Sequence, residues 1–192
     1  MVEKVDICVG VYTLAVTFRN VVDRSAWAFA GVYGPNLDRD RRILWDELAG
    51  VLSWWNMPWC IGGDFNATQF PSERSGGARL DSAVREFYNF ISEQGLVDLP
   101  LVGGSFTWLI SDDPPLWSRN DHFLVFPEME AWFLGVMQKK LPLLCLDHFP
   151  IILDMGDMVR GKKLFKFENM WLKAEGLVPL VKQCWDFYEL QA

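Results

Sequence analysis

One short stretch restricts the fold more than any other: residues 59–66 read WCIGGDFN, an apolar run that ends in two glycines, an acid and an amide. A short apolar run bounded by turn signals is typical of a buried central strand. Positions two apart at a strand end point the same way, so we expect Asp64 and Asn66 to face one pocket. Gly62 and Gly63 would let backbone or ligand approach closely there. The alternative is an ordinary turn, because these residue types also favour turns.

The rest of the chain alternates strand-like and helix-like patterns, which predicts an α/β fold with many antiparallel neighbours. Strands are expected over residues 12–18, 27–33, 58–63, 106–109, 121–126, 132–137 and 149–153. Helices are expected over about 38–55, after the polar loop 67–79, and over 175–190, from apolar residues that recur on one face.

Composition narrows the class of protein. The chain has 192 residues, of which 51% are hydrophobic, enough for one domain with a sizeable core. No apolar run is long enough to span a bilayer, and no secretory leader is visible at the start, so we expect no membrane partner and a nuclear or cytoplasmic location. The four cysteines lack metal-ligand spacing and are expected to be reduced.

The net charge of −7 is unusual for a nucleic-acid binder, which more often carries a basic field. A metal-dependent nuclease can nevertheless be acidic, because its site gathers carboxylates around a cation. The charge predicts weak nonspecific affinity for DNA.

Histidine is scarce, and His148 lies directly after Asp147. On an extended chain these neighbours diverge, but from a loop both could reach one pocket. A histidine beside a scissile phosphate can act as a general base or bind a phosphate oxygen, although a lone histidine often only caps a strand. Asp121 is a better pocket candidate than His122, which points away from it on a strand. The alternative role of Asp121 is a surface salt bridge with Arg119.

Two aromatic residues complete the candidates. Trp108 could stack on a base or sugar, or be a core aromatic. Tyr33, at a strand end, could donate its hydroxyl to a phosphate, or simply form a wall. Acids at three strand ends, a histidine and a tyrosine suit metal-assisted phosphodiester hydrolysis. No serine-nucleophile turn, Walker-type loop or dinucleotide fingerprint occurs in the sequence.

Several segments carry a resemblance, in this order: VYGPN at 32–36, GGDFN at 62–66, GSFTW at 104–108, SRNDHFL at 118–124, DHFPI at 147–151 and KFENMW at 166–171. Together they resemble the endonuclease/exonuclease/phosphatase superfamily, which includes deoxyribonuclease I. More closely, the chain resembles the endonuclease region of plant LINE-type (non-LTR) retrotransposon polyproteins.

The resemblance implies a DNase I-like four-layer α/β sandwich, two packed mixed β-sheets flanked by helices, over residues 1–157. It implies that 158–192 lead toward a reverse transcriptase, the partner domain in a longer polyprotein. The implied activity is Mg²⁺-dependent nicking of DNA, with Mn²⁺ as a possible substitute. The resemblance also implies a role for each candidate residue. Asp64 activates water with Asn66 beside it, His148 contacts the phosphate, and Asp121 orients His148. Asp147 lies near the metal, Tyr33 and Asn36 lie along the phosphate path, Trp108 lines the DNA-facing rim, and Arg119 binds substrate.

Departures from the family pattern are also present. The family places an Asn-bearing strand and a strand with a metal-binding Glu before the Tyr12 strand, so we expect the first strands and that Glu to be missing here and activity to be impaired. Leu146 replaces the usual serine before Asp147, and Asn120 and His122 flank Asp121 in place of leucine and arginine. The alternatives are another phosphatase of the same superfamily and an inert remnant with only a binding role.

Overall fold

The computed structural model describes residues 1–75, 81–110, 113–143, 147–155 and 157–158, together with residues 179 and 182. The chain divides into two compact units, Met1–Arg160 and Gly161–Ala192. The helix expected over 175–190 lies almost wholly outside the described residues, and the assignment of 158–192 stays a prediction. None of the described helices combines the length and the apolar character needed to cross a bilayer.

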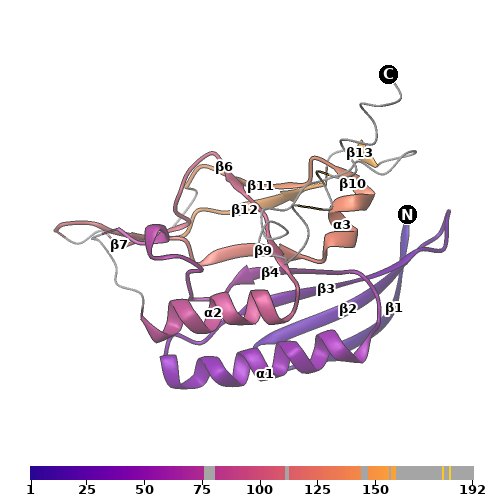
Figure 1. Cartoon of the computed structure of the whole chain (residues 1–192), viewed down its shortest axis with the longest axis horizontal. Coiled ribbons are helices and arrows are strands. Elements are labelled where there is room, and N and C mark those ends of the chain that lie inside the picture. Colours follow the sequence, from indigo (N-terminus) through magenta and orange to yellow (C-terminus); the bar gives the residue numbers. More distant parts are fainter. Residues whose placement is uncertain are drawn as a thin grey trace. The chain divides into compact units, whose positions relative to one another are not determined.

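The first unit is built on a six-stranded mixed sheet (Figure 1). Its strands, in spatial order, are β1 (Val2–Val9), β2 (Thr13–Asn20), β3 (Ala26–Tyr33), β4 (Trp59–Asp64), β9 (Asp121–Val125) and β5 (Val97–Asp98). The strands β3 and β4 are parallel, and all other neighbours are antiparallel. The candidate strand β4 is therefore central, as its continuous apolar run predicted.

Two helices, α1 (Asp38–Trp54) and α2 (Ser82–Glu93), lie side by side along one face of this sheet (Figure 1). The helix α2 begins at Asp81, whose carboxylate accepts a hydrogen bond from the Val84 N–H at 2.9 Å. Trp45 of α1 stacks against Phe87 and Phe90 of α2, with ring centroids 5.3 and 5.0 Å apart. This aromatic core fixes the helix layer against β2, β3 and β4.

The opposite face of the large sheet packs against a smaller mixed sheet. That sheet has the order β12 (Ile151–Asp154), β11 (Met137–Lys140) and β6 (Leu101–Val102). A second apolar cluster, which includes Cys60, Val125 and Leu153, joins the two sheets. The smaller elements are the 3₁₀ turn η1 (Pro71–Glu73), the hairpin β7 (Trp108–Ile110) and β8 (Leu116–Ser118), α3 (Pro127–Trp132), and the pair β10 (Phe133–Leu134) and β13 (Asp157–Met158).

The predicted α/β sandwich of packed mixed sheets is confirmed. One local prediction is wrong, and one strand was not predicted. Residues 132–137 do not form one strand, because α3 begins at Pro127, which favours a first helical turn, and extends to Trp132. The strand that was not predicted is β1, which contains a β-bulge between Lys4 and Asp6.

Candidate functional site

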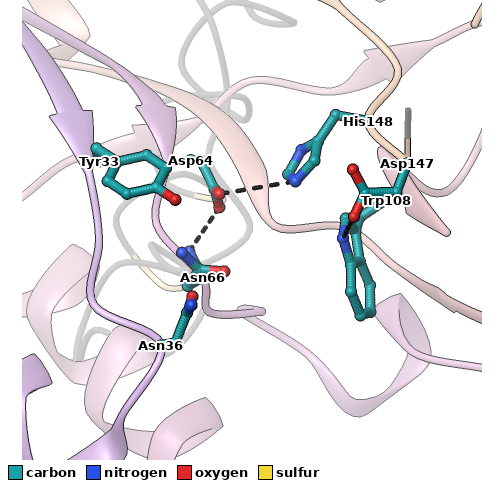
Figure 2. Close-up of a pocket in the computed structure, with 7 residues that line it drawn as sticks. All are labelled: Tyr33, Asn36, Asp64, Asn66, Trp108, Asp147 and His148. Atoms are coloured by element: carbon teal, nitrogen blue, oxygen red, sulfur yellow. Dashed lines mark hydrogen bonds and ion pairs between the residues drawn. The ribbon is translucent and has the colours of Figure 1, made fainter. Parts of the chain in front are cut away.

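A pocket of about 390 Å³ opens where β3 and β4 end (Figure 2). Its lining is Tyr33, Asn36, Asp64, Asn66, Trp108, Asp147 and His148. These residues come from four separate parts of the sequence. The fold therefore brings together seven of the nine residues that the sequence analysis selected, and an eighth, Asp121, reaches the pocket through His148. Their roles stay predictions.

The end of β4 positions Asp64 through a tight local turn. Gly63 has φ +148°, and a Cβ there would collide with the Val32 carbonyl of the neighbouring strand β3. Asn66 adopts a left-handed conformation with φ +48°. Its N–H donates to Asp64 Oδ1 at 2.8 Å, and its Nδ2 donates to the Gly34 carbonyl at 2.8 Å. Asp64 and Asn66 thus share the pocket by means of a turn that closes on the carboxylate, rather than by strand alternation.

His148 lies between two carboxylates. Its Nδ1 is 3.2 Å from Asp121 Oδ2, and its Nε2 is 3.9 Å from Asp64 Oδ2. The acids Asp64 and Asp121 are themselves opposite each other in the register of β4 and β9. The pairing of these two strands therefore fixes the spacing of both acids, and His148 joins them from a loop. This arrangement supplies a carboxylate, an imidazole and a second carboxylate that orients the imidazole.

The electrostatics of Asp64 differ from those of an exposed acid. Burial raises the pKa of the Asp64 carboxyl above its ordinary value of 3.8. The nearby Asp121 carboxylate also raises this pKa, whereas the Asn66 N–H and His148 lower it by a smaller amount in total. An acid with a raised pKa is a better proton acceptor when ionised, and its charge favours a nearby cation.

The rim of the pocket carries Trp108, Asp147, Tyr33 and Asn36. The Trp108 indole Nε1 donates to Asp147 Oδ2 at 3.0 Å, so the indole is tethered by an acid (Figure 2). Tyr33 is 70% exposed, which leaves most of its ring available to a ligand. Trp108 is thus a rim residue rather than part of either apolar core cluster.

Arg119 does not line this pocket, and its expected role in binding substrate stays a prediction. Its Nη1 lies 2.7 Å from Glu73 Oε1 and its Nη2 lies 2.7 Å from Asp98 Oδ1. All three side chains are at most 12% exposed. Arg119 precedes β9 and is part of a buried ion network with Glu73 and Asp98. Its proposed alternative, a salt bridge with Asp121, is absent among the ion pairs of the described residues.

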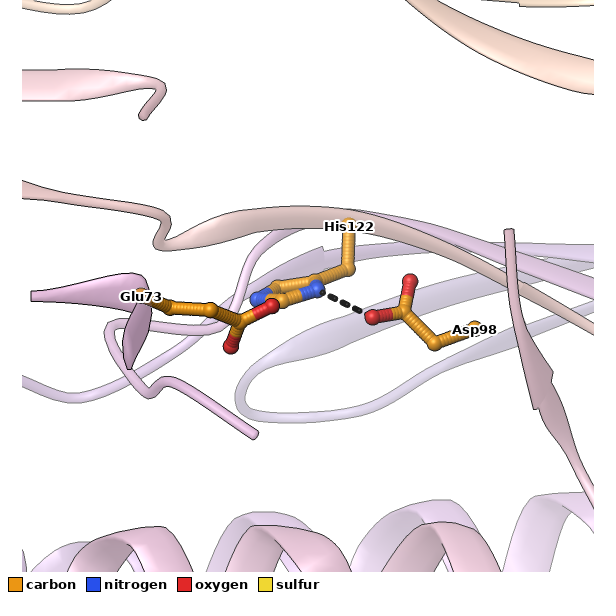
Figure 3. A group of neighbouring side chains, drawn as sticks. All are labelled: Glu73, Asp98 and His122. Atoms are coloured by element: carbon orange, nitrogen blue, oxygen red, sulfur yellow. Dashed lines mark hydrogen bonds and ion pairs between the residues drawn. The ribbon is translucent and has the colours of Figure 1, made fainter. Parts of the chain in front are cut away.

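His122 belongs to the same buried network. Its Nδ1 lies 3.1 Å from Asp98 Oδ2, and its ring is fully buried (Figure 3). Ligand atoms of Glu73, Asp98 and His122 all lie within 4.8 Å of one another, which is a spacing that could hold a metal ion. However, the Arg119 guanidinium already pairs with both carboxylates. We therefore interpret this group as an ion network in which Arg119 supplies the positive charge.

The pocket offers a different donor set, made of oxygen atoms. Asp64, Asp147, Asn36 and Asn66 all line it, and carboxylate and amide oxygens are the ligands that Mg²⁺ prefers. Mg²⁺ commonly binds through one or two carboxylates and keeps other positions for water and substrate phosphate. Burial and the nearby Asp121 disfavour the ionised form of Asp64 and raise its pKa, so a cation in the pocket would stabilise that carboxylate. The residues present therefore fit a hard divalent cation.

Sequence reasoning missed the buried residues that hold the site in place. Thr107, Glu73, Asp98 and Gln138 are polar, largely buried, and hydrogen-bonded to segments that are distant in sequence. The only available signal was the position of Thr107 immediately before Trp108 in a candidate motif. Partners 13 to 46 residues away cannot be deduced from local pattern.

No protein-family model matches the chain, and no curated protein matches it. Solved structures do match. The endonuclease domain of TRAS1, a telomere-specific non-LTR retrotransposon, aligns with 79% of this chain at a TM-score of 0.60 and 17% identity. The AP endonuclease LMAP from Leishmania major aligns with 76% at a TM-score of 0.59 and 15% identity. The alignments cover 65% and 55% of those two structures. The fold is therefore DNase I-like, the α/β fold of these two endonuclease structures.

Proposed function

We propose that this chain is a Mg²⁺-dependent phosphodiester hydrolase domain that nicks DNA and derives from a plant LINE-type (non-LTR) retrotransposon. The observation that carries the proposal is the convergence of Asp64 and His148 on one pocket of a DNase I-like fold, with Asp121 3.2 Å from the far side of the His148 ring. Such a set can activate water and bind the phosphate that the water attacks.

Asp64 is the residue that activates water. Its carboxylate is held by the Asn66 N–H, and burial raises the pKa of its carboxyl group, which strengthens it as a proton acceptor. Asn66 fixes this carboxylate from one side, while the His148 ring lies on the other (Figure 2). A water held beside Asp64 would attack a phosphate that lies against His148.

His148 binds the scissile phosphate, and Asp121 orients it. With Nδ1 directed at Asp121 Oδ2, the ring presents Nε2 toward the pocket. A proton on Nε2 would donate to a phosphate oxygen as negative charge develops there. Tyr33 and Asn36 extend the polar lining along the path of the phosphate backbone.

A divalent cation at this pocket would be held by Asp147 and by oxygens beside it, and Mg²⁺ is the ion that fits the donor set, with Mn²⁺ as a substitute. When bound, it would neutralise charge on the phosphoryl oxygens. The two carboxylates in the pocket lining are Asp64 and Asp147, and Asp147 Oδ2 already accepts a hydrogen bond from Trp108. Because the Trp108 N–H competes with a cation for this oxygen, we expect weak metal binding and, with it, a low nicking rate of this chain.

Two features favour DNA over a small phosphate ester. Trp108 lies at the pocket rim, where an indole can stack on a base or sugar. A TRAS1 endonuclease domain is among the structures with this fold. A reverse transcriptase domain in the same polyprotein is the partner that fits this origin.

Relaxation of supercoiled plasmid by the purified chain, with Mg²⁺ or with EDTA, tests the proposal. Slow Mg²⁺-dependent nicking that disappears in Asp64→Ala is the expected result. Hydrolysis of a small phosphate ester without DNA nicking would favour a phosphatase of the same superfamily. If neither substrate is cut, and calorimetry detects no Mg²⁺ binding that depends on Asp64 and Asp147, the inert binding remnant is correct.

A further inference from the structure

We infer that Thr107 is a positioning residue that holds the Asp121 and His148 segments of the site in register. This inference rests on the proposed function for its catalytic consequence, but the geometry of the contact stands apart from it. Thr107 is fully buried and does not line the pocket. Thr107 acts through the residues that line the pocket.

The Thr107 hydroxyl accepts two backbone hydrogen bonds. Its Oγ1 lies 3.0 Å from the Asn120 N–H and 3.1 Å from the Asp121 N–H. A hydroxyl oxygen has two acceptor lone pairs, so one side chain can satisfy both donors. The backbone that carries Asp121 is thereby fixed at the start of β9.

The Thr107 backbone reaches the histidine segment. Its carbonyl accepts from the Phe149 N–H at 2.7 Å, directly after His148, and its N–H donates to the Ser118 carbonyl at 2.9 Å. Trp108 and His148 also form an isolated antiparallel bridge. The same residue is therefore bonded to the strand that bears Asp121 and to the loop that bears His148.

The segment that carries Asp64 is joined to Thr107 indirectly. The Asn120 carbonyl accepts from the Phe65 N–H at 2.9 Å, one residue after Asp64. The Asn120 and Asp121 backbone is thus held by Thr107 on one side and by the Asp64 segment on the other. The 3.2 Å separation of His148 Nδ1 and Asp121 Oδ2 depends on both attachments. Displacements of about 1 Å in such a site can reduce rates about 100-fold.

The test compares Thr107→Val, which keeps the shape and removes the acceptor, with Thr107→Ser, which keeps the acceptor. The matched control is Thr68→Val, since Thr68 is equally buried and its Oγ1 has no partner among the described residues. Plasmid nicking should show kcat reduced at least tenfold with KM unchanged in Thr107→Val. Thr107→Ser should retain kcat within about threefold, and Thr68→Val should match the parent chain.

A second readout does not depend on activity. The chain contains two histidines, and His122 is fully buried whereas the His148 side chain is 38% exposed, so ring resonances can be assigned to each. NMR should show shifted His148 ring resonances and shifted Asn120 and Asp121 amides in Thr107→Val, but a parent-like spectrum at these positions in Thr107→Ser. If Thr107→Val does not fold, Thr107→Cys, with a weakly accepting sulfur, should give a smaller change of the same kind.

Unchanged kcat and unchanged His148 resonances in Thr107→Val would overturn the inference, as would equal effects of Thr107→Val and Thr68→Val. If the parent chain does not nick DNA at all, the proposed function fails. The NMR comparison then still decides whether Thr107 holds His148 and Asp121 together.

Discussion

Trp108 and Asp147 are joined by a hydrogen bond of 3.0 Å between the indole Nε1 and Oδ2, although they are 39 residues apart in sequence. The bond directs the indole along the pocket rim and occupies one oxygen of an acid that is expected to lie near the metal. A single contact therefore links the predicted DNA-binding surface with the predicted metal site.

The two roles of Trp108 can be separated by substitution. Trp108→Phe keeps an aromatic face but removes the N–H, so we expect nearly unchanged affinity for single-stranded DNA and tighter Mg²⁺ binding through the released Asp147 oxygen. Trp108→Ala removes the stacking face and should weaken DNA binding by about 1–3 kcal/mol. Fluorescence anisotropy and calorimetry measure the two quantities. Equal DNA affinity for all three proteins would exclude stacking.

The Asp64 charge should lower stability at neutral pH. Burial raises the pKa of this carboxyl group in the fold, so the ionised form is less favourable in the folded than in the unfolded chain. Asp64→Asn removes the charge and keeps an acceptor for the Asn66 N–H. We expect a larger free energy of unfolding for the variant at pH 7.

The difference should shrink as the pH falls through the folded-state pKa of Asp64 and vanish below about 3.8, where the acid is protonated in both states. Urea unfolding of the parent chain and of Asp64→Asn across this pH range checks the sign of the difference in their free energies of unfolding. A variant less stable than the parent at pH 7 would contradict it.

Arg119 should contribute to stability and not directly to DNA binding. Arg119→Met leaves Glu73 and Asp98 buried without their cation, which we expect to cost about 3–5 kcal/mol. The exposed Arg39, paired with Asp40 at 3.6 Å, provides the control, and Arg39→Met should change stability by less than about 0.5 kcal/mol. Denaturant unfolding measures both. Loss of DNA affinity in Arg119→Met with parental stability would restore the substrate-binding role.

Cys60 should be chemically inert in the folded chain. Burial raises the pKa of its thiol to about 12, and the thiolate is the reactive form. Cys8 is only half-buried and provides an internal reference. Alkylation by iodoacetamide at pH 8, followed by peptide mass mapping, should label Cys8 in minutes and Cys60 only after unfolding. Labelling of both at one rate would show that β4 is not a buried central strand.

Local pattern was sufficient for the elements with strong periodicity. The apolar face of α1 and the continuous apolar run of β4 each specify one burial pattern, and both elements were predicted within a few residues. Pattern failed at β1, because the bulge between Lys4 and Asp6 breaks the alternation of apolar and polar residues.

The site was predictable where each residue sits at the end of an element, as Asp64 does. It was not predictable where a side chain is directed by a distant partner. Arg119 and Asp121 are two residues apart and were expected to share a face, but Glu73 and Asp98 draw Arg119 into the interior. Sequence spacing does not contain that information.

The central claim is that Asp121 and His148 act as one unit on a phosphodiester beside Asp64. The most direct test of this claim is a double-mutant cycle. It compares the nicking rates of Asp121→Asn, His148→Gln and the double variant with that of the parent, under single-turnover conditions with Mg²⁺. We predict that His148→Gln lowers the rate about 100-fold and that the double variant is no slower than His148→Gln alone. Rate losses that multiply, or nicking that persists in Asp64→Ala, would contradict the account.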